Sequence, residues 1–375
     1  MIYREFKGKR LSMLGMGMMR LPVIDGKASD VDEIEAAEMV DIAIKNGVNY
    51  FDTAWMYHHG NSEEVTGRIL AKYPRDTFFL ASKFPGFSLS QIEKKEEVFE
   101  TQIKRCGVGY FDFYLFHNVS EENIDWYTDE RYGIMDYLLE QKRLGRIKHI
   151  GFSAHGKYDT LVRFLDAYGE HLEFCQLQVN YLDWTFQSAK EKVELMRSRG
   201  IPVWVMEPVR GGSLASLSEK DAGALKALRP DESIAAWSFR FLQSIDGIDV
   251  ILSGMSNREQ LYDNLKTFAD EKPLDENEMS AILKVAENMI TRVPCTECRY
   301  CTEYCPKEID IPRLLKIYNR YGNTLTNKIN PERVSDIDED KRPESCIGCR
   351  VCESVCPQNI KISEVLAELN EKLKK

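Results

Sequence analysis

Residues 49–57 read Asn-Tyr-Phe-Asp-Thr-Ala-Trp-Met-Tyr, a short stretch that joins a strand pattern to two side chains with useful chemistry. The run Val48–Thr53 is rich in apolar and β-branched residues and predicts a buried strand that opens at the carboxylate of Asp52. Tyr57 follows five residues later in a polar loop, where its phenol can be presented to a substrate. If this stretch is a catalytic centre, later strands should end in residues that complete it.

Strand and helix patterns alternate along the chain around this stretch. Eight strands are predicted, at Ser12–Met19, Val48–Thr53, Phe78–Lys83, Phe111–His117, His149–Ser153, Phe174–Asn180, Pro202–Glu207 and Ile248–Ser253. Helical patterns lie between them, at Glu33–Asn46, Ser62–Lys72, Leu89–Cys106, Arg131–Leu144, Tyr158–Ala167, Phe186–Arg199, Asp231–Gln243 and Asn257–Phe268.

Most of the predicted strands are continuous apolar runs, which is typical of a parallel sheet buried on both faces. Eight strand–helix repeats over about 260 residues favour an α/β fold of the (β/α)8 TIM-barrel type. An open doubly wound sheet is the alternative, although no strand is followed by a G-x-G-x-x-G turn.

Composition limits the classes of partner and the location of the protein. The chain has 375 residues, enough for two folding units, and 43% of them are hydrophobic. A net charge of −10 argues against nucleic-acid binding, which needs a basic surface. No apolar run reaches the roughly 18 residues that span a bilayer, and the first residues lack the apolar core of a signal peptide. We therefore expect a cytoplasmic protein without a membrane partner.

Four titratable residues are expected at one end of the predicted barrel, because catalytic groups in this fold sit at the C-terminal ends of the strands. They are Asp52 at the end of the second strand, Tyr57 in the loop after it, Lys83 at the end of the third strand and His117 at the end of the fourth. Singly, each has an ordinary explanation as a surface tyrosine, a solvated strand end or a packing histidine. Together they suit carbonyl reduction, in which a phenol protonates the developing alkoxide beside a cationic lysine.

These segments resemble the aldo/keto reductase superfamily. The stretch from Phe51 to Gly67 follows the pattern Phe-Asp-Thr-Ala-x-x-Tyr-x-x-Gly-x-Ser-Glu-Glu-x-x-Gly and is similar to that family's second strand, loop and helix. Ala81-Ser82-Lys83 and Asp112-x-Tyr114-Leu115-x-His117 are similar to the segments that carry its lysine and histidine. The resemblance covers roughly residues 3–268. It implies Tyr57 as the general acid, Lys83 and Asp52 as its tuners, and His117 as the group that orients the carbonyl.

The same resemblance implies NAD(P)H as the hydride source. Ser153 at the fifth strand and Gln178 in the sixth look like the family's carboxamide-binding positions. Ala154 stands where an asparagine is usual, with His155 next to it, and the seventh-strand segment Met206–Gly212 lacks the usual stacking aromatic.

The segment after the eighth strand, Ser253–Asn264, resembles the family's adenosine-phosphate segment and implies cofactor contacts at Gly254, Arg258 and Asn264. Gly254 replaces the lysine, and Gln260 the arginine, that commonly clamp a 2′-phosphate in this family. Arg258 could compensate from a neighbouring position, so the choice between NADH and NADPH stays open.

Eight of the ten cysteines form two matching runs, Cys295-x-x-Cys298-x-x-Cys301-x-x-x-Cys305-Pro306 and Cys346-x-x-Cys349-x-x-Cys352-x-x-x-Cys356-Pro357. Each resembles the ligand run of bacterial two-cluster ferredoxins. The resemblance implies two [4Fe-4S] clusters, one on Cys295, Cys298, Cys301 and Cys356 and the other on Cys346, Cys349, Cys352 and Cys305. A pair of four-cysteine zinc sites is the alternative. The other two cysteines, Cys106 and Cys175, are expected to be packing residues.

We therefore expect a barrel over residues 1–270, a linker helix over 271–293 and a small, mainly helical ferredoxin-like domain over 294–375. The expected function is an oxidoreductase that reduces a small-molecule carbonyl or related substrate, with electron transfer through two 4Fe-4S clusters. Clusters carry single electrons whereas nicotinamide carries hydride, so an external ferredoxin or a flavin donor is an expected partner. The alternative is an iron–sulfur electron carrier or redox sensor whose barrel binds a ligand or partner without nicotinamide turnover.

Overall fold

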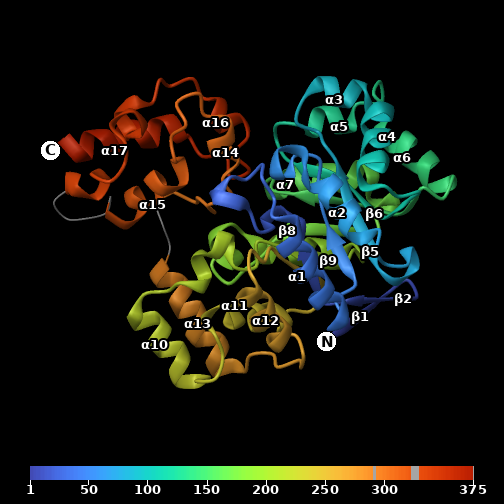
Figure 1. The fold of residues 1–375 in the computed structure, drawn as a ribbon, viewed down its shortest axis with the longest axis horizontal. Helices are drawn as coiled ribbons and strands as arrows, with labels where there is room; N and C mark the ends of the chain where they lie inside the picture. The colour runs from blue at the N-terminus through green and yellow to red at the C-terminus, as the bar shows by residue number, and fades with distance from the viewer. Residues whose placement is uncertain (290–292, 322–328, 375) are drawn as a thin grey trace. The chain divides into compact units, whose positions relative to one another are not determined.

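The computed structural model of the protein describes residues 1–289, 293–321 and 329–374. The chain forms two compact units (Figure 1). Unit 1 comprises Met1–Val209 and Leu214–Ala286, and unit 2 comprises Arg210–Ser213 and Glu287–Lys375. Residues 290–292 of the expected linker lie outside the described residues.

Unit 1 is built on a closed barrel of eight parallel strands, so the predicted (β/α)8 fold is confirmed. Around the barrel the order is β10 (Ile248–Ser253), β3 (Leu14–Gly17), β4 (Tyr50–Asp52), β5 (Phe79–Phe84), β6 (Phe111–Val119), β7 (Ile147–Ala154), β8 (Phe174–Gln178) and β9 (Val203–Met206). Each strand pairs with the next one along the chain, and β10 closes the ring on β3. All eight strands fall within or overlap the predicted apolar runs.

The larger helices of unit 1 are α1 (Glu33–Lys45), α2 (Ser62–Leu70), α4 (Lys95–Cys106), α6 (Ile134–Arg143), α7 (Tyr158–Tyr168), α9 (Ala189–Ser198), α10 (Glu219–Leu228), α11 (Ile234–Gln243), α12 (Arg258–Thr267) and α13 (Glu276–Met289). Of these, α10 has no counterpart among the predicted helices. The predicted helix Leu89–Cys106 is interrupted at Lys94, so that α3 (Leu89–Glu93) precedes α4. Two further short helices, α5 (Ile124–Thr128) and α8 (Asp183–Phe186), lie in loops.

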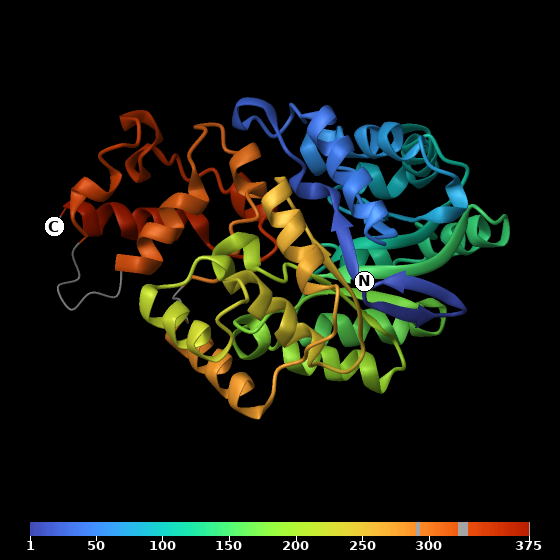
Figure 2. The same cartoon turned by 60° about the horizontal axis from the view of Figure 1, so that its bottom comes forward.

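A β-hairpin of β1 (Tyr3–Phe6) and β2 (Lys9–Ser12) precedes the first barrel strand and was not predicted (Figure 2). Its two turn residues, Lys7 and Gly8, have φ of 47° and 75°, as a type I′ turn requires. Phe6 packs into a buried aromatic cluster with Phe113 and Trp204. The hairpin thus fills the end of the barrel where the strands begin, which leaves the opposite end for chemistry.

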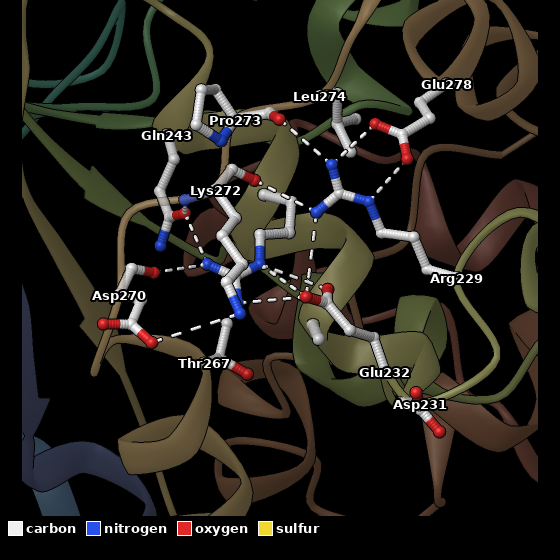
Figure 3. A network of polar contacts seen from close by, with 12 residues as sticks. Arg229, Asp231, Glu232, Gln243, Thr267, Asp270, Lys272, Pro273, Leu274 and Glu278 are labelled. Carbon is white, nitrogen blue, oxygen red and sulfur yellow. Dashed lines mark hydrogen bonds and ion pairs between the residues drawn. The ribbon is translucent and has the colours of Figure 1, made fainter.

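Two arginines bind the chain segment that leaves the barrel (Figure 3). The guanidinium of Arg229 donates to both carboxylate oxygens of Glu278 at 2.6 Å and to the carbonyls of Lys272 and Pro273 at 3.1 and 3.0 Å. Arg240, almost fully buried, donates to the carbonyl of Asp270 at 2.8 Å. These bonds hold residues 270–278 and the start of α13 against the rest of unit 1.

Unit 2 is mainly helical, as predicted, with α14 (Tyr300–Glu303), α15 (Ile311–Tyr321), α16 (Val351–Ser354) and α17 (Ile362–Lys374). Its core includes the apolar faces of α15 and α17. Arg299 and Arg350 begin α14 and α16 with positive φ, so the two cysteine runs repeat one backbone shape. No helix within the described part of the chain is long and apolar enough to cross a membrane.

A short segment from far upstream in the sequence belongs to unit 2. Arg210–Ser213 directly follows the β9 region of the barrel, yet it packs with the residues around the first cysteine run. Gly211 has φ of 62°, and a Cβ atom on it would lie 2.2 Å from the carbonyl oxygen of Thr296. Only glycine fits such a close approach of two backbones.

Candidate active site and cluster-binding sites

Lys83, Asp52 and Tyr57 meet at the C-terminal end of the barrel. The ammonium of Lys83, on β5, donates to the Asp52 carboxylate at 2.5 Å and to the Tyr57 hydroxyl at 3.3 Å. It donates a further hydrogen bond of 3.1 Å to the carbonyl of Thr53. Lys83 is fully buried and Asp52 is 2% exposed. The neighbouring strand ends therefore bring three of the four predicted catalytic residues into direct contact.

Sequence reasoning missed a residue that supports this contact. Gln176, buried in β8 on the other side of the barrel, donates to the second oxygen of Asp52 at 3.1 Å. Each carboxylate oxygen thus has its own donor, and the orientation of Asp52 is fixed before any ligand binds. Gln176 and Gln178, two amides at alternate positions of a buried strand, were the available signal, because buried polar side chains need partners inside the barrel.

His117, the fourth predicted residue, faces Tyr57 from β6. The two rings lie edge to face with centroids 6.1 Å apart, and Phe87 packs on the histidine at 5.0 Å. Burial, the Lys83 ammonium and His155 lower the pKa of His117 well below its usual value, so the ring is neutral at neutral pH. Its Nδ1 is buried without a hydrogen-bond partner among the described residues. A neutral imidazole at this position can donate a hydrogen bond to a substrate oxygen.

The loop that carries Tyr57 is held by His58, which sequence reasoning also missed. The backbone N–H of Leu21 donates to His58 Nε2 at 3.2 Å, so Nδ1 carries the proton and donates to the carbonyl of Ala28 at 2.7 Å. Burial lowers the pKa of His58, which keeps this tautomer neutral. His58 and His59 have φ of 51° and 54°, a strained pair that these bonds sustain.

The predicted carboxamide-binding residues lie at the ends of β7 and β8. The hydroxyl of Ser153 accepts a hydrogen bond of 2.8 Å from the backbone of Asn118, just after His117. Gln178 donates to the buried carboxylate of Asp183 at 2.7 Å, which fixes the direction of its amide. Burial is the main cause that lowers the pKa of the neighbouring His155 to about 4. Amide, hydroxyl and neutral imidazole are the groups that recognise a carboxamide, so the residues present fit a nicotinamide.

The three residues predicted to contact the adenosine part lie after β10. Gly254 leaves no room for a side chain, because a Cβ there would be 2.8 Å from the side chain of Arg20. Arg258 forms ion pairs with Glu35 and Glu38 of α1. Asn264 is buried and donates to Ser253 at 2.9 Å.

The eight cysteines of unit 2 gather in two groups, each around its own cavity. One cavity is lined by Cys295, Cys298, Cys301 and Cys356, and the other by Cys305, Cys346, Cys349 and Cys352. Each group therefore combines three cysteines of one run with the last cysteine of the other, which is the membership expected for two cubane clusters. Cys106 and Cys175 are buried in unit 1.

The chemistry of these thiols fits a positively charged metal group. Burial raises the pKa of Cys295 to about 11. Burial, the Glu353 carboxylate and the neighbouring thiols raise the pKa of Cys352 to about 12. Such thiols ionise when iron supplies the compensating charge, since a coordinating thiol is deprotonated.

Comparison with known families covers both units. The model of the aldo/keto reductase family matches residues 13–287. The model of a 4Fe-4S dicluster domain matches residues 294–361, which favours iron–sulfur chemistry over the zinc alternative.

Two curated relatives show the range of similar proteins. The chain is 30% identical over 215 residues to "Probable aldo-keto reductase 1" of Glycine max, an alignment that covers 55% of this chain and 58% of that protein. It thus spans less than two thirds of that relative's length. It is 28% identical over 229 residues to the "NADH-specific methylglyoxal reductase" of Escherichia coli strain K12, with 56% of this chain and 68% of that protein covered.

Solved structures share the fold of the barrel. An aldo-keto reductase from Klebsiella pneumoniae in complex with NADPH superposes with a TM-score of 0.62 at 16% identity, over 76% of this chain and 96% of that one. Because the family model matches most of the barrel, the chain belongs to the aldo/keto reductase family, and it is an oxidoreductase that carries a 4Fe-4S dicluster domain after its barrel.

Proposed function

We propose that this protein reduces the carbonyl group of a small molecule with NAD(P)H, and that Tyr57 donates the proton. The observation that carries the proposal is the contact of Lys83 with both Asp52 and Tyr57 at a buried strand end. A charged lysine is costly to bury unless it is paired, so its burial beside a phenol supports a role in catalysis.

The residues act as follows. NAD(P)H, when bound, supplies the hydride. The neutral imidazole of His117 donates a hydrogen bond to the carbonyl oxygen and orients it towards Tyr57. The Tyr57 hydroxyl passes its proton to that oxygen as negative charge develops. The Lys83 ammonium, 3.3 Å away, stabilises the phenolate that remains, and Asp52 keeps Lys83 charged and in place.

We assign the cofactor contacts to Ser153, Gln178, Gly254, Arg258 and Asn264, as the family resemblance implies. All five lie on or after β7, β8 and β10 of the barrel. For the domain boundaries we retain 1–270, 271–293 and 294–375 as working limits.

In unit 2 we propose two [4Fe-4S] clusters, which supply or store single electrons when bound. The two four-cysteine groups support this number. An external ferredoxin or a flavin is the proposed exchange partner. In support, Cys349 is exposed and Ile347, two residues before it, is 61% exposed, so a partner can approach this side of the second cysteine group.

The proton-donor assignment is tested with Tyr57→Phe in anaerobically purified protein. We expect kcat to fall about 10²- to 10⁴-fold on any carbonyl that the wild type reduces, because general acid catalysis contributes that much. Iron and sulfide content should stay unchanged. The matched control is Tyr158→Phe at an exposed position of α7, which should retain activity. Turnover by Tyr57→Phe equal to that of the control would refute the assignment.

A second candidate function is an electron carrier or redox sensor whose barrel does not turn over a nicotinamide. The observation that favours it is Gly254, which offers no side chain where the family uses a lysine. Titration of the folded, cluster-loaded protein with NADH and NADPH separates the two. Binding of neither, with clusters that accept electrons from dithionite, would establish the carrier.

A further inference from the structure

The arginine within the adenosine-phosphate segment, Arg258, is already paired with carboxylates. Arg258, at the first turn of α12, donates from Nε and Nη2 to the two oxygens of Glu35 at 2.8 and 2.6 Å. Its Nη2 also contacts Glu38, one turn further along α1. The guanidinium holds the pKa of Glu35 below its usual range, so this carboxylate is charged at neutral pH. Two negative groups therefore share one positive group.

Gly254 and Gln260 stand where the family commonly has a lysine and an arginine, and neither carries a charge. A side chain at Gly254 is excluded because Arg20 occupies the adjacent space, with its Cβ and Cγ 2.8 Å from the glycine's Cβ position. Gln260 is neutral, and its side-chain oxygen accepts a hydrogen bond of 2.8 Å from the backbone of Ser256. The Ser256 hydroxyl in turn donates to the carbonyl of Arg20 at 2.9 Å, which ties the two loops together.

We propose that Glu35 and Glu38 make this protein selective for NADH over NADPH. The inference rests on the proposed function, since it requires that a nicotinamide cofactor binds with its adenosine over this segment. Carboxylates accept hydrogen bonds from a ribose 2′-hydroxyl, whereas an available arginine is what accommodates a 2′-phosphate. Here the arginine is held by the carboxylates, and the carboxylates repel a phosphate.

The size of the effect follows from exposure. The side chains of Arg258, Glu35 and Glu38 are 45%, 28% and 52% exposed, so water screens their charges. We therefore expect NADH to bind about tenfold more tightly than NADPH rather than exclusively, because water and salt weaken the repulsion between exposed charges.

The test measures dissociation constants for NADH and NADPH by quenching of tryptophan fluorescence, without turnover. The variant Glu35→Gln/Glu38→Gln should bind NADPH about tenfold more tightly than the wild type does, because Arg258 is released. Adding Arg258→Gln to it should abolish this gain. The matched control is Glu33→Gln on the same helix, which removes the same charge from a different pair, with Arg68, and should leave the NADH/NADPH ratio unchanged.

Each result separates the inference from the function on which it rests. Wild-type protein that binds NADPH as tightly as NADH would overturn the inference, and would point to Arg20 as the phosphate contact. An unchanged ratio in Glu35→Gln/Glu38→Gln would overturn it as well. Binding of neither nicotinamide by folded protein would instead refute the nicotinamide-dependent function.

Discussion

Replacing Lys83 by methionine tests how much the buried ion pair of Lys83 and Asp52 contributes to the stability of unit 1. The side chains of Lys83 and Asp52 are 0% and 3% exposed, and Gln176 is the remaining donor to the carboxylate once the ammonium is gone. Leaving one member of a buried ion pair uncompensated costs about 3–5 kcal/mol. For a unit of this size, each kcal/mol lowers the unfolding midpoint by about 2–4 °C, so Lys83→Met should lose roughly 10 °C at pH 7.

The double variant Asp52→Asn/Lys83→Met should recover most of that loss. An asparagine carries no charge, and its side-chain oxygen still accepts a hydrogen bond from Gln176. Both variants should be inactive.

The assay is thermal unfolding followed by tryptophan fluorescence at a fixed scan rate. It reports on unit 1, because all five tryptophans of the chain lie there, at positions 55, 126, 184, 204 and 237. A Lys83→Met midpoint within 2 °C of the wild type, or a double variant no more stable than the single one, would show that the burial argument is wrong; the 2 °C threshold is about 1 kcal/mol.

Three further outcomes are expected. Gln176→Leu should lower kcat with little change in KM, because it frees an oxygen of Asp52 and loosens the Lys83 position; steady-state kinetics with a pH profile checks this, and an unchanged kcat would contradict it. Cys349→Ser should lower iron content by up to half whereas Cys106→Ser should not, as measured by iron and sulfide assay; equal losses would contradict the ligand assignment. The pKa of His155 is lowered to about 4 in the folded protein, so on acidification this imidazole is protonated first in the unfolded chain. The free energy of unfolding should therefore fall between about pH 6.5 and 4. In His155→Gln that fall should be smaller, as unfolding midpoints at pH 7 and pH 5 will show.

The sequence predicts the barrel well because most of its eight strands are continuous apolar runs separated by helical patterns. The hairpin that precedes the barrel could not be predicted in this way, because its strands Tyr3–Phe6 and Lys9–Ser12 are short and largely polar. The break at Lys94 could not be predicted either, because nothing in the residue pattern marks the interruption between α3 and α4.

At the site, the meeting of Asp52, Tyr57 and Lys83 could be predicted because strand order alone places consecutive strand ends together. The roles of Gln176 and Arg20 could not. Gln176 acts across the barrel, far along the sequence from Asp52, and Arg20 restricts Gly254 through space. Both contacts depend on how the strands close into a barrel, and local residue patterns carry no information about that closure.

The membership of Arg210–Ser213 in unit 2 bears on how the protein is synthesised and how it could have evolved. During translation this segment is synthesised well before Thr296. It therefore has no packing partner until the rest of the barrel and the first cysteine run have been synthesised. A gene truncated after the barrel would leave Gly211 without that partner, and the downstream exon or cassette alone would encode an incomplete unit. Recombination that exchanged the cysteine-rich end between relatives would therefore have to preserve a glycine inside the barrel's own coding region.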